Sequence, residues 1–360
     1  MSLKVRVKKK YSGFVLDVAF ETESKKIGIL GASGCGKSLT LKSIAGLIRP
    51  DEGSISYEDR MLFDSDKGID VRAGKRQIGY LFQDHALFPN MSVRENIEAA
   101  LHGYARMKRR SIRTGRADAG MNRTADDILR EFGLWDVKDQ RPHELSGGQK
   151  QRTALARIFA CDPTLLLLDE PFSAMDSFLK ERLRLELTDV LEMYDKTFIL
   201  VSHDRDEVYQ MCDHLILMDN GRVIAQGDTD ELFADPGTVA AARLTGCKNI
   251  SRIEKLTEHR VRALDWKGTE LVTDGKVSDD ITHIGIRAHD LMPGDGGVNV
   301  IACGRFSVSR LPFEWYITLE NGMWWKAARE LYDRYDEGMI PQYVSVDAGK
   351  ILLLRDGPRK

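Results

Sequence analysis

A glycine-rich segment near the amino terminus has the residue types and spacing of a phosphate-binding loop. Residues 31–38 read Gly-Ala-Ser-Gly-Cys-Gly-Lys-Ser, follow a strand-like run at 26–30 and precede a helix-like run at 39–47. In such a loop, successive backbone N–H groups and the helix N-terminus hold phosphate oxygens. Lys37 is predicted to reach the β- and γ-phosphates of ATP, and Ser38 to ligate Mg²⁺. Nucleotide contacts are predicted at Gly31, Ala32, Ser33, Gly34, Cys35, Gly36, Lys37 and Ser38.

Two carboxylates follow the uninterrupted apolar run Leu165–Leu168. A run without a polar face is typical of a strand that is buried on both sides of a parallel sheet. Asp169 is expected at the carboxyl end of that sheet, where it would help to hold Mg²⁺. Glu170 would face the γ-phosphate and is the candidate general base for an attacking water.

The segment Ser146-Gly147-Gly148-Gln149 predicts a second anion site. Ser146 and Gln149 have the spacing of a capping box that opens a helix over 150–160, and the two glycines would let a ligand approach its N–H groups. One ATP already has a loop at 31–38. The second site is most simply explained by a head-to-tail homodimer in which each ATP lies between two chains.

Length and composition predict two ordinary folded domains. The 360 residues are 42% hydrophobic and 30% charged, and 53 Lys and Arg stand against 55 Asp and Glu, so the basic excess of a nucleic-acid binder is absent. The five cysteines are scattered and show no zinc spacing, which favours a reducing compartment. The amino terminus does not resemble a secretory signal, and no apolar run is long enough to cross a bilayer, so a membrane role would require a partner.

The pattern of apolar runs predicts an α/β domain followed by a β-rich one. Strand-like and helix-like stretches alternate over residues 1–240, with an inserted helical subdomain at about 93–144. Its segment 105–123 carries seven basic residues. They could contact anionic lipid or nucleic acid, but we favour a solvated helix face or loop, because a run of charges is usually exposed to solvent. Residues 246–360 hold short β-like runs, and Asn321-Gly322 predicts a hairpin within 316–326. We expect a small barrel or sandwich there.

With these motifs in this order, residues 1–235 resemble the ATP-binding cassette (ABC) family. The resemblance implies a P-loop NTPase core with a mixed sheet, and ATP hydrolysis. It also implies that Gln83 senses Mg²⁺ and the attacking water, that Asp176 crosses the dimer interface, and that His203 contacts the γ-phosphate. Tyr11 is the candidate for stacking on adenine, with Phe14 as the alternative.

Cys35 lies inside the phosphate loop, beside Lys37 and at a predicted helix N-terminus. These conditions lower the pKa of a thiol, so we expect a thiol reagent to inactivate the protein and ATP to protect it. A small filler residue without chemistry is the alternative interpretation.

Segments 66–71 and 75–89 resemble the ATPases of molybdate importers, and 245–250 and 284–290 resemble the oligomer-binding-like (OB-like) regulatory domain of importer ATPases. This resemblance implies import of molybdate, tungstate or sulfate. It further implies integral membrane permease subunits, an extracytoplasmic solute-binding protein as partner through the permease, no nucleic acid, and a peripheral position on the cytoplasmic face of the cell membrane. Three alternatives stay open: a sugar or another solute, a soluble ABC ATPase that acts outside transport, and a regulatory protein in which ATP only switches dimerisation.

Overall fold

The computed structural model describes residues 2–112, 123–173, 177–328 and 340–357. The chain divides into two compact units, Met1–Val223 and Ile224–Lys360. Asp176 lies outside the described residues, as do most side chains of the basic segment 105–123. None of the described helices is both long and apolar enough to span a membrane.

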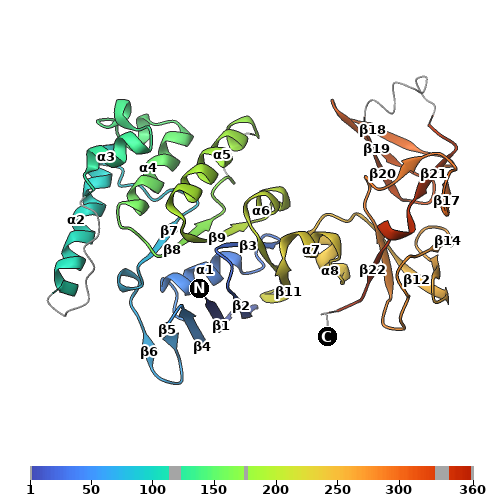
Figure 1. The fold of residues 1–360 in the computed structure, drawn as a ribbon, viewed down its shortest axis with the longest axis horizontal. Coiled ribbons are helices and arrows are strands. Elements are labelled where there is room, and N and C mark those ends of the chain that lie inside the picture. Colours follow the sequence, from blue (N-terminus) through green and yellow to red (C-terminus); the bar gives the residue numbers. More distant parts are fainter. Residues whose placement is uncertain (1, 113–122, 174–176, 329–339, 358–360) are drawn as a thin grey trace. The chain divides into compact units, whose positions relative to one another are not determined.

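The first unit holds ten strands and the start of β11, which form one mixed sheet in the order β6-β5-β4-β1-β2-β11-β10-β3-β9-β8-β7 (Figure 1). Strands β10, β3, β9, β8 and β7 pair in parallel, whereas β1 pairs antiparallel with β2 and β4. The strands are β1 (Leu3–Tyr11), β2 (Phe14–Thr22), β3 (Lys26–Gly31), β4 (Glu52–Tyr57), β5 (Arg60–Asp64), β6 (Ile69–Asp70), β7 (Ile78–Leu81), β8 (Leu165–Asp169), β9 (Thr197–Ser202), β10 (His214–Asp219) and β11 (Arg222–Asp228).

Burial follows the apolar pattern of the strands. All five residues of β8 and all six of β9 are buried, as expected for strands covered on both faces. In the first half of β1, buried and exposed residues instead alternate. Leu3, Val5 and Val7 are the buried ones, so one face of the strand lies against the core. Because β3, β9 and β8 are parallel, their carboxyl ends lie at the same edge of the sheet. The phosphate loop follows β3 at this edge, and the Asp169–Glu170 pair lies at the end of β8.

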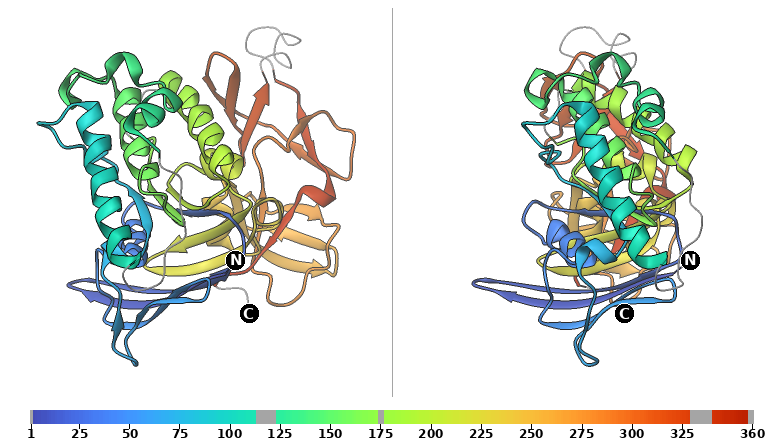
Figure 2. Two further views of the ribbon diagram at one scale, coloured as in Figure 1. Left: turned by 60° about the vertical axis from the view of Figure 1, so that its left-hand side comes forward. Right: turned by 90° about the vertical axis from the view of Figure 1, so that its left-hand side faces the viewer.

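Helices pack against this sheet. Three of them, α2, α3 and α4, form a separate group beside α5 (Figures 1 and 2). Among the described residues of 93–144, none forms a strand, as predicted for the helical subdomain. The helices of this unit are α1 (Lys37–Ala45), α2 (Val93–Ile112), α3 (Ala125–Glu131), α4 (Gly147–Phe159), α5 (Ser177–Tyr194) and α6 (Arg205–Met211), with short 3-10 turns at Ala73–Lys75, Trp135–Val137 and Pro142–Glu144.

The end of α1 is fixed by a buried arginine. Gly46 adopts a left-handed conformation, with φ of 76°, at the C-cap. Arg76, only 1% exposed, donates from Nη1 to the carbonyls of Ser43 at 2.9 Å and Ile44 at 2.7 Å. These bonds satisfy carbonyls that a helix end leaves open, so they hold the helix that carries the phosphate loop.

The second unit consists of short strands with two short helices. Its sheets have the orders β14-β13-β12-β15-β22, β16-β21-β17 and β18-β19-β20. Trp325, Ile317 and Val344 lie in its buried core. The elements are α7 (Thr229–Ala234), α8 (Val239–Leu244), β12 (Asn249–Thr257), β13 (Arg260–Ala263), β14 (Thr269–Val272), β15 (His283–Ile286), β16 (Met292–Pro293), β17 (Asn299–Ala302), β18 (Ser307–Arg310), β19 (Glu314–Thr318), β20 (Trp324–Ala328), β21 (Tyr343–Val346), a 3-10 turn at Ala348–Lys350, and β22 (Leu352–Leu354).

The predicted β-rich character of the carboxyl-terminal region is confirmed. So is its hairpin, because β19 and β20 pair antiparallel and Gly322 takes a φ of 86° in the connection. The functional domain limits of 1–240 and 246–360 stay predictions.

Candidate nucleotide site

The phosphate loop connects β3 to α1. Gly34 and Gly36 have φ of 80° and 105°, values that favour glycine, and Gly36 is the N-cap of α1. Ala32, Ser33 and Gly34 are exposed. The exposed loop and the N-terminus of α1 thus offer backbone N–H groups to an anion.

Lys37 lies at the base of this loop. Its side chain is 4% exposed, and Nζ donates to the carbonyl oxygens of Gly31 at 2.9 Å and Ala32 at 3.2 Å. These bonds hold the Lys37 ammonium beside the loop, so its positive charge is close to the phosphate oxygens that the loop would bind.

The carboxylate of Asp169 ties β8 to α1 and β7. Ser38 Oγ donates to Asp169 Oδ1 at 2.6 Å, and the Tyr80 hydroxyl donates to Asp169 Oδ2 at 2.7 Å. Burial raises the pKa of Tyr80 far above its usual range, and its hydrogen bond to the carboxylate raises it further. Tyr80 therefore stays a hydrogen-bond donor that fixes the orientation of Asp169.

Glu170 lies between the phosphate loop and His203. Its Oε1 is 3.6 Å from Lys37 Nζ, and its Oε2 is 3.3 Å from His203 Nδ1. Glu170 has a φ of 47°, and its N–H donates to the carbonyl of Val201 at 3.0 Å. The left-handed backbone at the end of β8 is a strained conformation for glutamate, as is common where a chain must present a functional side chain.

Gln83 is linked to the same region through Ser173. Gln83 Nε2 donates to Ser173 Oγ at 3.0 Å, and Ser173 Oγ donates to the carbonyl of Glu170 at 3.1 Å. This amide contact joins the segment after β7 to the segment after β8. The role of Gln83 as a metal ligand stays a prediction.

The predicted capping box at Ser146 is present. Ser146 Oγ accepts from the N–H of Gln149 at 3.3 Å, and Gln149 Oε1 accepts from the N–H of Ser146 at 2.8 Å, so α4 begins at Gly147. Gly148 is buried, and a Cβ there would lie 3.0 Å from Leu183 Cδ2 on α5. Close helix packing is therefore one reason for Gly148 that sequence reasoning missed.

Of the two candidate aromatic residues, Phe14 lies nearer to the phosphate loop. The tip of its ring is 3.2 Å from the position that a Cβ on Gly36 would take. Tyr11 is 37% exposed, and its ring centroid is 6.5 Å from that of Phe14. The choice between Tyr11 and Phe14 for adenine stacking stays a prediction.

The expectation of a reactive Cys35 is wrong on its physical premise. Cys35 is 5% exposed, and burial raises the pKa of its thiol, an effect that outweighs the nearby Lys37 and the hydrogen bond from the Lys37 backbone. The sequence places the thiol beside a cation but does not show that the loop buries it.

Tyr80 and Ser173 are site residues that sequence reasoning did not find. Tyr80 pairs with Leu167 across the parallel β7–β8 register, two residues before Asp169. No local motif marks this relationship, because it depends on which strand lies beside β8.

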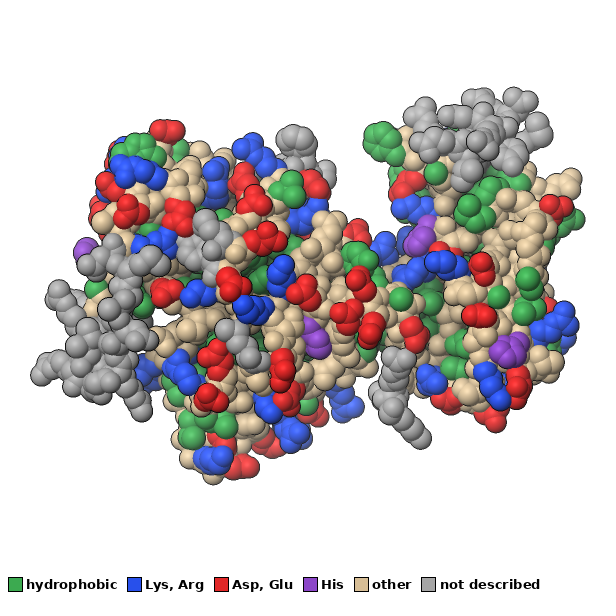
Figure 3. All heavy atoms as spheres, in the orientation of Figure 1, with side chains coloured by type: hydrophobic (Ala, Val, Ile, Leu, Met, Phe, Trp, Pro, Cys, Tyr) green, Lys and Arg blue, Asp and Glu red, His purple; other side chains and the backbone are tan. Residues whose placement is uncertain are grey.

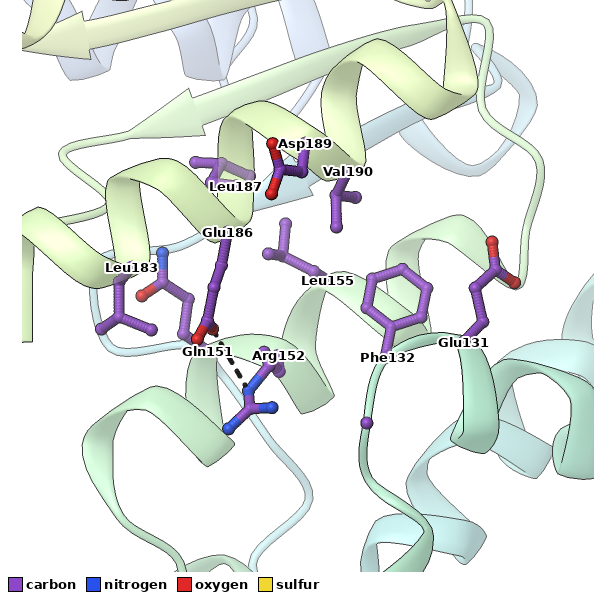
Figure 4. Close-up of a pocket in the computed structure, with 11 residues that line it drawn as sticks. Glu131, Phe132, Gln151, Arg152, Leu155, Leu183, Glu186, Leu187, Asp189 and Val190 are labelled. Atoms are coloured by element: carbon purple, nitrogen blue, oxygen red, sulfur yellow. Dashed lines mark ion pairs between the residues drawn. The ribbon is translucent and has the colours of Figure 1, made fainter.

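A cavity of about 310 Å³ lies beside α4, away from the phosphate loop (Figure 4). It is lined by residues of α4 and α5 and by Glu131, Phe132 and Gly133. Arg152 Nε on α4 and Glu186 Oε2 on α5 form an ion pair at 3.5 Å, drawn as a dashed line in Figure 4. This pair joins the helix after Ser146 to the helix that follows the Glu170 segment.

Figure 3 shows Lys and Arg side chains mixed with Asp and Glu over the visible face. This distribution agrees with the balanced composition.

A phosphate loop, paired carboxylates after a buried parallel strand, and a histidine after the next strand define a P-loop nucleotide-binding protein. Residues 17–173 match the family model described as "ABC transporter". A solved structure, that of cbiO1 from Clostridium perfringens, part of the ABC transporter complex cbiONQ, is 30% identical with a TM-score of 0.51, and the match covers 67% of this chain and 92% of that one. The chain belongs to the ABC transporter family.

Three curated relatives share this region. Molybdenum import ATP-binding protein ModC of Paramagnetospirillum magneticum is 37% identical over 65% of this chain and 61% of its own length. Spermidine/putrescine import ATP-binding protein PotA of Nitratidesulfovibrio vulgaris is 38% identical over 62% of this chain and 56% of its own length. Sulfate/thiosulfate import ATP-binding protein CysA of Vibrio vulnificus is 35% identical over 62% of this chain and 61% of its own length. The chain spans about six tenths of the length of these relatives.

A second solved structure, the dimeric post-hydrolysis state of an ATP-binding cassette bound to ADP and Pi, is 26% identical with a TM-score of 0.50. That match covers 64% of this chain and 99% of the other. Both structural matches fall within the ABC class that the site geometry indicates.

Proposed function

We propose that the chain is the ATP-hydrolysing subunit of an ABC importer that works as a homodimer and brings an oxyanion, molybdate, tungstate or sulfate, into the cell. The observation that carries the catalytic part is the convergence of Lys37, Glu170 and His203 beside the phosphate loop. The relatives named for molybdenum and sulfate import support the choice of solute.

ATP would lie with its phosphates on residues 31–38. The exposed loop N–H groups and Lys37 would bind the phosphate oxygens, and Phe14 or Tyr11 would stack on the adenine. The fit to Mg²⁺ rests on two hard oxygen donors, Ser38 Oγ and Asp169 Oδ1, which already lie 2.6 Å apart. Mg²⁺ bound there would neutralise charge on the β- and γ-phosphates.

Glu170 would act as the general base. Its carboxylate follows β8 directly and reaches both Lys37 and His203, so it can accept a proton from a water beside the γ-phosphate. His203, exposed after β9, would contact the γ-phosphate, and Gln83 would relay the state of the site to the permease.

The dimer would be completed by the segment 146–149 of the second chain. A capping box closes the N-terminus of α4, and Ser146 is exposed there. This terminus would meet the γ-phosphate bound by the other chain. Asp176 would cross the same interface. Closure over two ATP molecules would move the permease, and hydrolysis would reopen the dimer.

The subunit would act at the cytoplasmic face of the cell membrane, bound to integral permease subunits that receive solute from an extracytoplasmic binding protein. Residues 1–240 would form the ATP-binding domain and 246–360 an OB-like regulatory domain. No role for nucleic acid is proposed.

The test is ATPase activity of the chain in complex with its permease and binding protein, while molybdate, tungstate, sulfate, maltose and spermidine are titrated. Stimulation by oxyanions alone is the expected result. Stimulation by maltose or spermidine alone would contradict the oxyanion proposal and keep the importer. Full activity without any membrane partner, unaffected by all five solutes, would contradict transport and favour a soluble ABC ATPase.

A further inference from the structure

The three-stranded sheet β18-β19-β20 has two chemically different faces. Ile317, Trp325 and Ala327 point into the core of the second unit and are buried. The residues that alternate with these along the strands lie opposite one another. Ser307 pairs with Thr318, Ser309 with Tyr316, and Thr318 with Trp324. Their side chains therefore share the outward face.

A hollow of about 280 Å³ lies on this outward face. Its lining brings together one ammonium, two aromatic rings and three hydroxyls. They belong to Lys248, Tyr316, Trp324, Ser307, Ser309 and Thr318.

Lys248 is held over the two rings by its neighbour. Asn249, 3% exposed, donates from Nδ2 to the carbonyl of Trp324 at 2.7 Å and accepts from the N–H of Trp324 at 2.6 Å. This bidentate contact anchors the start of β12 to β20. Lys248 Nζ consequently lies 4.7 Å from the Trp324 ring centroid and 5.1 Å from that of Tyr316.

The polar groups of the hollow are available to a ligand. Among the residues that the structure describes, Lys248 has no ion-pair partner, whereas the nearby Lys326 is neutralised by Glu314 at 2.5 Å. Within the same described ranges, the hydroxyls of Ser307, Ser309 and Thr318 have no hydrogen-bond partner in the protein. Trp324 leaves 41% of its surface exposed.

We propose that this hollow binds a small molecule that carries an anionic group on a six-membered ring, a class to which sugar phosphates belong. The Lys248 ammonium pairs with the anion, and the three hydroxyls donate to its oxygens. The exposed ring of Trp324 packs against the less polar face of the ligand ring. A ligand of this size fits a hollow of about 280 Å³.

The experiment is calorimetric titration of the full chain with three probes: glucose 6-phosphate, glucose, and inorganic phosphate. Glucose has the ring without the anion, and phosphate has the anion without the ring. The expected result is that glucose 6-phosphate binds at least about ten-fold more tightly than either, because only it uses both halves of the site. Equal affinity for inorganic phosphate, or no saturable binding of glucose 6-phosphate, would overturn the proposal.

Two variants locate the site. Lys248→Met and Trp324→Leu are each expected to weaken glucose 6-phosphate binding by about ten-fold or more. Lys350→Met, which alters another exposed lysine of the same unit, should leave it unchanged. Undiminished binding in Lys248→Met would overturn the assignment of the probe to this hollow. Ser309→Ala, a smaller change, should weaken binding with an unchanged thermal unfolding profile and covers the case that Trp324→Leu does not fold.

Discussion

Lys37 and Glu170 form an ion pair of 3.6 Å between Nζ and Oε1, joining the base of the phosphate loop to the end of β8. The second oxygen of the same carboxylate lies 3.3 Å from His203 Nδ1 after β9. One carboxylate thus links three segments that are distant in the chain. Any nucleotide whose phosphates rest on the loop would have this carboxylate beside it.

Glu170→Gln should abolish turnover and preserve ATP binding. The amide keeps the shape of the side chain but cannot accept a proton, so kcat is expected to fall about 10²- to 10⁴-fold. Phosphate release and equilibrium binding of a fluorescent ATP analogue measure the two properties. A variant that retains more than a tenth of the wild-type kcat would contradict the role of Glu170.

Tyr80→Phe should raise the Mg²⁺ concentration needed for half-maximal ATPase activity by about ten-fold, because Asp169 loses the donor that orients it. The free energy of unfolding should fall by about 1–2 kcal/mol. Tyr57→Phe is the matched control, since its hydroxyl donates to the carbonyl of Thr164 at 3.0 Å, away from Asp169. An equal shift in Mg²⁺ requirement in both variants would contradict the role of Tyr80.

Ser146→Ala and Thr124→Ala each remove the side-chain hydrogen bond that caps a helix N-terminus. Each residue closes a capping box, at α4 and at α3, so each change should lower the free energy of unfolding by about 1 kcal/mol. Only Ser146→Ala should also lower ATPase activity strongly, because only that helix N-terminus is proposed to meet ATP. If both variants lose equal activity, the effect is one of stability and the functional assignment of Ser146 fails.

Burial raises the pKa of all five cysteine thiols, to about 11 at Cys247 and Cys303. At pH 7 little thiolate forms, so N-ethylmaleimide should modify the folded protein slowly at every cysteine, Cys35 included. Peptide mapping of alkylated protein measures each site, with guanidinium-unfolded protein as the control. Modification of Cys35 at the rate of free glutathione would contradict this prediction.

The same pKa shifts determine how stability depends on pH. A thiol whose pKa is raised in the folded state holds its proton when the unfolded thiol has lost it. The free energy of unfolding should therefore fall as pH rises from about 9 to 11. Denaturant unfolding at pH 7, 9 and 10.5 measures this dependence, and a Cys247→Ala, Cys303→Ala variant should show a smaller fall.

The sequence was sufficient for the elements whose information is local. The buried run before Asp169 predicts β8, the spacing of Ser146 and Gln149 predicts the start of α4, and Asn321-Gly322 predicts the β19–β20 hairpin. Each of these depends on residues a few positions apart, so no knowledge of the fold is needed.

Features that depend on non-local packing were missed. The burial of Cys35 follows from the walls around the loop, and the contact of Gly148 with Leu183 follows from the crossing of α4 and α5. The Tyr80–Asp169 bond requires that β7 lie beside β8.

In the proposed homodimer, ATP is held between two chains, with the phosphate loop of one and Ser146 of the other. Sedimentation velocity of the Glu170→Gln variant with and without Mg-ATP tests it most directly. The prediction is a shift from monomer to dimer on addition of ATP, lost when Ser146→Ala is added. A variant that binds ATP fully and sediments as a monomer at all protein concentrations would contradict the claim.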